Sequence, residues 1–128
     1  MINSEQKWQL ERIEQVQQYI ERHLHQPLNR DILASVCGFS IPHFHRVFTQ
    51  HVGESAISYV RRMRLERAAR KLRMGAIDVL EVGLCAGYDS LAAFSRAFKR
   101  QYGLTPAEFR RLPCGAATEL IRTKGKPV

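Results

Sequence analysis

The feature of this sequence that most restricts its fold is a pattern of residues that occurs twice in the chain. In each copy a turn glycine is followed within three positions by a serine, then by two phenylalanines four positions apart and a closing glycine. The turn glycines, Gly38 and Gly87, are forty-nine positions apart. Four further positions recur at an offset of fifty: Phe44 and Phe94, Arg46 and Arg96, Phe48 and Phe98, and Gly53 and Gly103. A repeat of this kind, in the same order, indicates that one structural unit has been duplicated.

Local chemistry predicts a turn followed by a helix in both copies. Glycine readily adopts the positive φ that ends a preceding helix, and Ser40 and Ser90 are preferred N-cap residues for the helix that follows. Phenylalanines four positions apart fall on one face of a helix and can be buried together. A small residue, Ala34 or Gly83, stands four positions before each turn glycine and allows two helices to cross closely. The pattern therefore predicts two helix-turn-helix motifs in an all-α chain.

The remaining helices are predicted from periodicity and caps. Residues 8–25 carry one apolar stripe, formed by Leu10, Ile13, Val16, Ile20 and Leu24. Residues 55–73 form the longest uninterrupted helical pattern, with Ser55 as its N-cap and an apolar seam at Ile57, Val60, Met63 or Arg64, Ala68 and Leu72. Asn29 is a further N-cap candidate, and Thr105 and Glu108 are expected to form a capping box. A helix of about nineteen residues spans ~28 Å, which is close to the ~34 Å between major-groove faces on one side of B-DNA. We therefore expect this linker helix to hold the two motifs about one DNA turn apart. Beyond Pro113 the chain is polar and basic, with only a weak helical piece at 116–122, as in a linker or trailing end.

The basic charge is concentrated in the second part of the chain. Residues 1–54 carry five basic and six acidic side chains, whereas residues 55–128 carry fifteen basic and six acidic, within a net charge of +8. Such an excess favours an anionic partner. Charge alone does not separate nucleic acid from an anionic membrane, or from a basic surface that only keeps the protein soluble. No apolar run approaches the ~18–20 residues of a membrane span, so we expect no membrane partner.

The cysteine content favours a reducing compartment. Three cysteines cannot all pair, and no two of them are closely spaced. Cys37 and Cys85 fall in predicted helices next to the two turns and are expected to be buried thiols, whereas Cys114 lies in the tail. The first residues are polar and lack the apolar core of a secretory signal. We therefore expect the protein to act in the cytoplasm.

No pattern in the sequence predicts a metal site, a cofactor or catalysis. Two histidine pairs, at positions 23 and 25 and at positions 43 and 45, have a spacing of two. Residues with that spacing point about 200° apart on a helix and cannot share one ion. There is no glycine-rich phosphate loop, CxxC pair, HExxH motif or nucleophile elbow. The composition and motifs therefore favour a binding protein over an enzyme.

Three segments in the second half form a distinctive combination: GYDS at 87–90, FSRAFKR at 94–100, and GLTP at 103–106 with Phe109 and Arg110. On these segments the chain resembles the DNA-binding region of the AraC/XylS family of bacterial transcription regulators, over about residues 8–112. In length it is close to the stand-alone members, such as the multiple-antibiotic-resistance and superoxide-response activators. The resemblance implies about seven helices in two helix-turn-helix subdomains. The expected domains are an N-terminal subdomain (8–54), a linker helix (55–74), a C-terminal subdomain (75–112) and a tail or linker (113–128).

The resemblance also implies how double-stranded DNA is bound. Each subdomain of the family places one helix in a major groove, and the protein binds asymmetric sites as a monomer. The implied base contacts are Pro42, His45 and Arg46 in the first recognition helix, and Leu91, Ala92, Ser95 and Arg96 in the second. The implied phosphate contacts are Ser40, Arg61, Ser90 and Lys99.

The chemistry of these positions predicts a different preference in each half-site. Arg46 can donate two hydrogen bonds to guanine O6 and N7, and His45 can donate or accept according to its tautomer. Pro42 offers only apolar contact. Leu91 and Ala92 stand where the antibiotic-resistance activators carry amides, and they can only pack on a thymine methyl group. We therefore expect looser sequence preference in the second half-site. The alternative for the repeated arginines is a surface ion pair with a nearby acid.

Three functions remain open at this point. The first is a sequence-specific transcription regulator, more commonly an activator in the resembled family, with RNA polymerase as a further candidate partner. The second is an architectural DNA-binding protein with little sequence preference, which the apolar pair at positions 91 and 92 would suit. The third is the DNA-binding part of a longer regulator that senses an effector.

Overall fold

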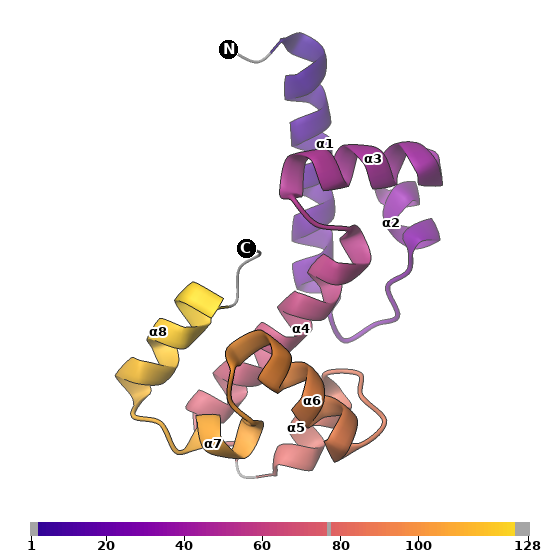
Figure 1. Cartoon of the computed structure of the whole chain (residues 1–128). Coiled ribbons are helices and arrows are strands. Elements are labelled where there is room, and N and C mark those ends of the chain that lie inside the picture. Colours follow the sequence, from indigo (N-terminus) through magenta and orange to yellow (C-terminus); the bar gives the residue numbers. More distant parts are fainter. Residues whose placement is uncertain (1–2, 77, 125–128) are drawn as a thin grey trace. The chain divides into compact units, whose positions relative to one another are not determined.

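The structure is a computed structural model that describes residues 3–76 and 78–124. Within these residues the chain forms eight α-helices and no strand (Figure 1), which confirms the predicted all-α class. The helices are α1 Ser4–Arg22, α2 Arg30–Cys37, α3 Ile41–Val52, α4 Ala56–Arg73, α5 Val79–Cys85, α6 Leu91–Tyr102, α7 Pro106–Arg110 and α8 Cys114–Lys124. The chain divides into two compact units, Met1–Val60 and Arg61–Val128, so that α4 contributes to both. None of these helices combines the length and apolarity that a bilayer-spanning segment needs.

The first unit packs α1, α2 and α3 against one another (Figure 1). α1 buries Ile13, Val16 and Ile20 of the predicted stripe, whereas Leu10 is half-buried. It begins at Ser4 rather than at residue 8 because Asn3 caps it. Asn3 Oδ1 accepts from the backbone N–H of Gln6 at 2.8 Å, and Gln6 Oε1 accepts from the N–H of Asn3 at 3.1 Å. The helix ends at Arg22, and the last residue of the stripe, Leu24, is buried just beyond it.

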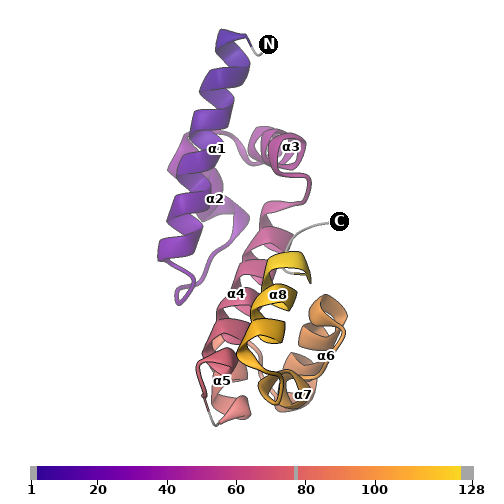
Figure 2. The same ribbon diagram turned by 90° about the vertical axis from the view of Figure 1, so that its left-hand side faces the viewer.

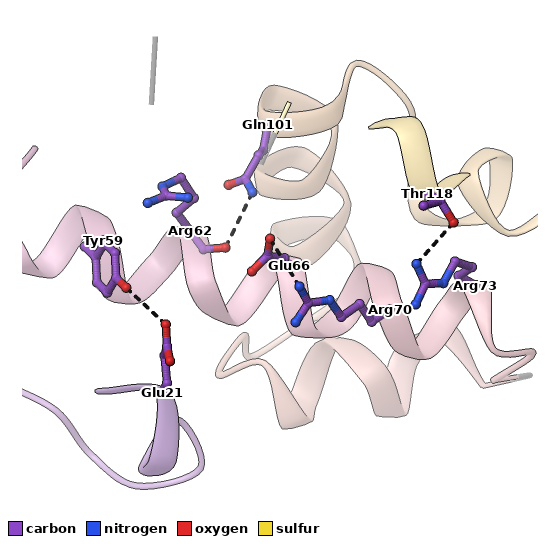
Figure 3. Close-up of polar contacts among 8 residues, drawn as sticks. All are labelled: Glu21, Tyr59, Arg62, Glu66, Arg70, Arg73, Gln101 and Thr118. Atoms are coloured by element: carbon purple, nitrogen blue, oxygen red, sulfur yellow. Dashed lines mark hydrogen bonds and ion pairs between the residues drawn. The ribbon is translucent and has the colours of Figure 1, made fainter. Parts of the chain in front are cut away.

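The core of the first unit is completed by α3 and the first turns of α4. Phe44 and Phe48 are fully buried with ring centroids 5.5 Å apart, and Tyr59 packs edge-on against Phe48 at 5.7 Å. The Tyr59 hydroxyl donates to Glu21 Oε1 at 3.5 Å, which links the start of α4 to α1 (Figure 3). The helices begin at the predicted caps, where a side-chain oxygen accepts from the backbone N–H three residues on: Asn29, Ser40 and Ser55.

The second unit is built around the aromatic side chains of α6 and α7. Phe94, Phe98, Tyr102 and Phe109 are each no more than 2% exposed, and Phe98 contacts the other three rings at centroid distances of 4.7 to 5.7 Å. The second half of α4 and the helix α5 complete this core. The predicted capping box of α7 forms in full, because Thr105 and Glu108 each accept a hydrogen bond from the other's backbone N–H.

The buried side of α4 is wider than the sequence predicted. Of the expected seam, Val60, Ala68 and Leu72 are buried, whereas Ile57, Met63 and Arg64 are half-buried. Leu65 and Ala69 are also buried, although they lie off that seam. In the second unit, Leu65, Ala68, Ala69 and Leu72 share one core with residues of α5, α6, α7 and α8, so more than one face of the helix is covered.

Cys85 is exposed, which corrects the prediction that it is a buried thiol. α5 turns Val82 and Gly83 toward the core, where Gly83 packs on Phe94. Cys85 is two positions beyond Gly83 and therefore points about 200° away from that contact. Cys37 is buried as predicted, and burial raises the pKa of its thiol.

The segment expected to be a tail contains α8, which belongs to the core of the second unit. The helix runs beyond the predicted 116–122 at both ends, and its residues Ala117 and Ile121 are 1% and 5% exposed. α8 lies alongside the second half of α4 (Figure 2), where Arg73 Nη1 donates to Thr118 Oγ1 at 3.2 Å (Figure 3). The sequence pattern did not predict this packing, because a short helix that buries only two side chains shows weak apolar periodicity.

Tyr102→Phe is expected to make the protein more resistant to alkaline unfolding. Burial raises the pKa of Tyr102 to about 12, and the neighbouring Gln101 side chain opposes this only in part. An unfolded tyrosine ionises near pH ~10, so this residue's contribution is intact below pH ~10 and is lost as the pH rises toward its folded value. Between pH ~9 and ~11.5, the free energy of unfolding measured in urea should fall further in the wild type than in the variant, by up to roughly 2 kcal/mol. Tyr19→Phe is the control, and equal losses in wild type and Tyr102→Phe would contradict the expectation.

Candidate nucleic-acid interface

The first helix-turn-helix motif consists of α2, the turn at Gly38 and α3. Gly38 has a φ of 74° and ends α2, and Ser40 Oγ accepts from the backbone N–H of His43 at 3.3 Å to start α3. The side of α3 that faces the core carries its buried phenylalanines, and the opposite side is exposed. That exposed side holds Ser40 at the cap and all three predicted base contacts of this motif: Pro42, His45 and Arg46.

The second motif repeats this construction with α5, the turn at Gly87 and α6. Gly87 has a φ of 97°, and Ser90 Oγ accepts from the backbone N–H of Ala93 at 3.1 Å. The predicted contact residues of this motif are all exposed except Ser95, which is half-buried: Ser90, Leu91, Ala92, Arg96 and Lys99. Leu91 is 45% exposed, which is a large apolar surface at the start of a helix.

A close helix crossing sets the position of α6 within the second unit. A Cβ placed on Gly83 would lie 2.7 Å from Phe94 Cδ2 and 2.9 Å from Phe94 Cβ, so only glycine fits at this crossing. The equivalent position of the first motif holds Ala34, which is 2% exposed. The crossing in the second motif is therefore the tighter of the two, and it fixes the face that α6 presents to solvent.

The repeated arginines, Arg46 and Arg96, occupy equivalent exposed positions in their motifs. Neither forms an ion pair with a carboxylate of the described residues. The surface ion pair considered as their alternative role is therefore absent from this part of the chain. Each guanidinium keeps its donors available for an external acceptor, in the geometry that suits a guanine edge or a phosphate.

α4 carries a row of arginines whose environments differ. Arg61 is exposed, as a phosphate contact would be. Arg64, one turn further on, is half-buried, and burial lowers its pKa. Arg64 was not among the predicted contacts, although its spacing of three from Arg61 already placed both on one side of the helix.

The histidines are not gathered with other metal-ligating groups. Among residues 3–76 and 78–124, no set of three or more His, Cys, Asp or Glu side chains is placed to hold a metal ion. His43 instead packs its ring against Phe39 at a centroid distance of 4.6 Å, and Phe39 contacts Trp8 at 5.5 Å. These rings support the turn from which α3 begins.

Two helix-turn-helix motifs, each with an exposed arginine on its second helix, define a class of DNA-binding proteins. Comparison with known proteins agrees with this class. A family model described as a helix-turn-helix domain matches residues 33–112. The regulatory protein SoxS of Escherichia coli K12 is 35% identical over 92 residues, which cover 72% of this chain and 86% of SoxS. The chain belongs to the AraC family of helix-turn-helix transcription regulators.

Longer relatives and solved structures share the same region. The right origin-binding protein of Escherichia coli K12 is 40% identical over 95 residues, which cover 74% of this chain. The chain spans about a third of that relative's length, 33%. The DNA-binding domain of AdpA, solved in complex with a target DNA, has a TM-score of 0.70 and 28% identity over 77% of this chain and 88% of its own. An AraC-type regulator from Chromobacterium violaceum has a TM-score of 0.75 and 27% identity, over 79% of this chain and 90% of its own.

Proposed function

We propose that this protein is a sequence-specific transcription regulator that binds promoter DNA as a monomer, with α3 and α6 in successive major grooves. The observation that carries the proposal is the matched pair of exposed arginines, Arg46 and Arg96, on equivalent faces of the two motifs. Arginine donates two hydrogen bonds to guanine O6 and N7, which is the commonest specific contact in the major groove. The net charge of +8 supplies the attraction to an anionic duplex.

The proposal assigns base reading and phosphate binding to different residues. The base contacts are Pro42, His45, Arg46, Leu91, Ala92, Ser95 and Arg96. The phosphate contacts are Ser40, Arg61, Ser90 and Lys99, and the serines act together with backbone N–H groups at their helix starts. In this proposal the two DNA-binding subdomains are residues 8–54 and 75–112, and residues 113–128 follow them as a tail or linker. The linker helix over residues 55–74 spaces the subdomains by about one DNA turn.

The two half-sites are proposed to differ in how strictly they are read. α3 presents polar donors in His45 and Arg46, whereas the first turn of α6 presents the apolar side chains of Leu91 and Ala92. Apolar groups at a base edge can only favour a thymine methyl group. We therefore expect strong preference at the bases facing α3 and near Arg96, with tolerance for different bases next to Leu91.

Binding near a promoter is proposed to change transcription initiation, through contact with RNA polymerase or by reshaping the DNA. Activation is the direction we propose, because it is the commoner outcome in the family that the sequence resembles. No catalytic step and no cofactor is part of the proposal, and its place of action is the nucleoid in the cytoplasm.

Selection of genomic DNA tests the proposal directly. The purified chain is mixed with a fragmented bacterial genome and excess competitor DNA, and bound fragments are read at base resolution. We expect an asymmetric motif in two segments about ten base pairs apart, protected on one face of the duplex. Capture of fragments without a shared motif, easily displaced by competitor, would instead identify an architectural protein.

Arg61→Ala is expected to weaken binding to specific and to random DNA by the same factor. A phosphate contact carries no sequence information, so its loss lowers the slope of log K against log salt by about 0.9 and leaves the specificity ratio unchanged. Fluorescence anisotropy on a selected and a scrambled duplex, across a salt series, measures both quantities. Arg122→Ala on α8 is the matched control for loss of one exposed charge. An unchanged salt slope in Arg61→Ala would remove Arg61 from the phosphate contacts.

A further inference from the structure

Four side chains of the second unit converge beside the turn between α5 and α6. Arg61 and Arg64 are three positions apart on α4 and so point to one side of that helix. Arg64 Nη1 lies 3.8 Å from the place that a Cβ on Gly87 would occupy, so this guanidinium reaches the turn itself. The next residue, Tyr88, is half-buried and holds its ring 5.7 Å from that of Phe94. Within the second unit, α4 therefore reaches the turn through Arg64, and Tyr88 of the turn packs on α6.

α6 contributes the fourth side chain, Arg100, whose charge acts on Tyr88. The end of α6 is tied to α4 because Gln101 Nε2 donates to the backbone carbonyl of Arg62 at 3.4 Å (Figure 3). Arg100 also lies one helical turn after Arg96, so the two share one exposed side of α6. We call Arg61, Arg64, Tyr88 and Arg100 the Tyr88 cluster. It continues the side of α6 that carries the proposed base contact.

Positive charge gathers around Tyr88 in this cluster. Burial raises the pKa of Tyr88, and the charges of Arg61, Arg100 and Arg64 act in the opposite direction. Arg61 and Arg100 form no ion pair with another described residue. The like charges of Arg61 and Arg100, both held beside one neutral phenol, repel each other, and a bound anion would relieve that repulsion.

The hydrogen-bonding groups of the cluster select the kind of anion. Guanidinium groups only donate, and a neutral tyrosine hydroxyl adds one more O–H donor. The ligand must therefore accept several hydrogen bonds at once and carry negative charge. A phosphodiester meets both needs, because its two non-bridging oxygens share the charge and each accepts from more than one donor.

We propose that Arg61, Arg64, Tyr88 and Arg100 together bind one backbone phosphate of the DNA, next to the bases that α6 contacts. This rests on the proposed function and adds three residues to the single phosphate contact assigned on α4. Because donors from α4, the turn and α6 hold the same phosphate, the cluster sets how far α6 can slide along the groove. It thereby determines the register in which Arg96 meets its base.

Two variants of the cluster separate charge from hydrogen bonding. Arg100→Gln removes one charge and should weaken binding roughly tenfold on specific and random duplexes alike, with the salt slope reduced by about 0.9. Tyr88→Phe keeps the ring against Phe94 and removes only the hydroxyl. It should weaken binding roughly threefold to tenfold with no change in the salt slope, because no counterion release is lost. Thermal unfolding of each variant establishes that the second unit is folded.

Arg122→Gln, on the exposed side of α8, is the matched control for Arg100→Gln. Each variant loses one positive charge, but Arg122 pairs with Glu119 rather than with the cluster. If Arg100→Gln weakens binding no more than Arg122→Gln does, the cluster does not contact DNA and the inference fails. If Arg100→Gln relaxes the choice of one base instead, Arg100 contacts a base and the inference fails as well.

Substitution of single phosphates identifies the ligand. In a set of duplexes, each with one neutral methylphosphonate, a single position next to the α6 half-site should weaken wild-type binding and have little further effect on Arg100→Gln. A scan without such a position would overturn the inference. Inorganic phosphate is tested separately on the protein without DNA. If it protects the wild type but not Tyr88→Phe from unfolding, and the methylphosphonate scan finds no position, the cluster holds a free anion and the inference is overturned as well. If the wild type shows no specific DNA binding at all, it is the proposed function that fails.

Discussion

Gly83→Ala is expected to destabilise the second unit by roughly 1–3 kcal/mol, although alanine is the better helix former. The new methyl carbon would lie 2.7 to 2.9 Å from Cδ2, Cγ and Cβ of Phe94. Rotation of the ring cannot relieve a contact with Cβ, so α5 and α6 must move apart. Phe94 is fully buried against Phe98 and Tyr88, and the movement therefore reaches the rest of the aromatic core. For a unit of this size the loss corresponds to a fall in Tm of about 5–15 °C.

Gly115→Ala is the matched control for this prediction. Gly115 lies in α8 of the same unit, and a Cβ placed there has no neighbour within 4 Å. The same substitution should therefore be neutral or should stabilise by up to ~1 kcal/mol. Thermal unfolding followed by circular dichroism, with amide exchange to assign the loss to α5 and α6, measures both. If Gly83→Ala were as stable as Gly115→Ala, the crossing of α5 and α6 would have room for a methyl group, and the prediction would be wrong.

Arg96→Ala is expected to cost ~1–3 kcal/mol at the selected site and to relax the choice of a single base. The arginine is exposed on α6 and has no acidic partner among the described residues, so its loss leaves no buried charge unpaired. Affinities are measured on the selected duplex and on duplexes with each base of the second half-site changed. The specific duplex should lose affinity, random DNA should lose much less, and one base position should become tolerant.

Two further variants separate the charge of Arg96 from its geometry. Arg96→Lys keeps the charge but loses the planar fork, so it should bind random DNA normally and still discriminate poorly at that base. Lys99→Ala removes a proposed phosphate contact from the same helix and should weaken both duplexes equally. Equal losses on specific and random DNA for Arg96→Ala would reassign Arg96 to the phosphate backbone.

The duplicated motifs differ at positions that bear on both stability and binding. Ala34 is accommodated at the crossing of the first motif, whereas Gly83 is required at that of the second. The exposed first turns are both apolar, with Ile41 and Pro42 in the first motif and Leu91 and Ala92 in the second, but the exposed His45 of the first motif is replaced by the half-buried Ser95 in the second. Stability of the second unit and tolerance in the second half-site are thus separate consequences of divergence between the copies.

Features that depend on residues within about four positions of one another were predictable from the sequence. The caps at Ser40, Ser90 and Thr105 and the turn at Gly87 are formed by side chains and backbone of the same segment. The burial of both phenylalanine pairs follows from spacing alone, because residues four apart must share a helix face. The all-α class and the solvent-facing sides of α3 and α6 therefore follow from local patterns of residues. The helix start at Asn3 was missed although its capping-box signal was present.

Features that depend on which elements meet were decided only by the tertiary structure. The exposure of Cys85, the burial of Leu65 and the packing of α8 each require knowledge of the neighbour that covers a helix face. The approach of Arg64 to the turn at Gly87 is of the same kind, since the two are distant in sequence and meet only through the packing of α4 on α5 and α6. Periodicity shows which residues of a helix share a side, and the physical partner of that side is set by the packing of the whole unit.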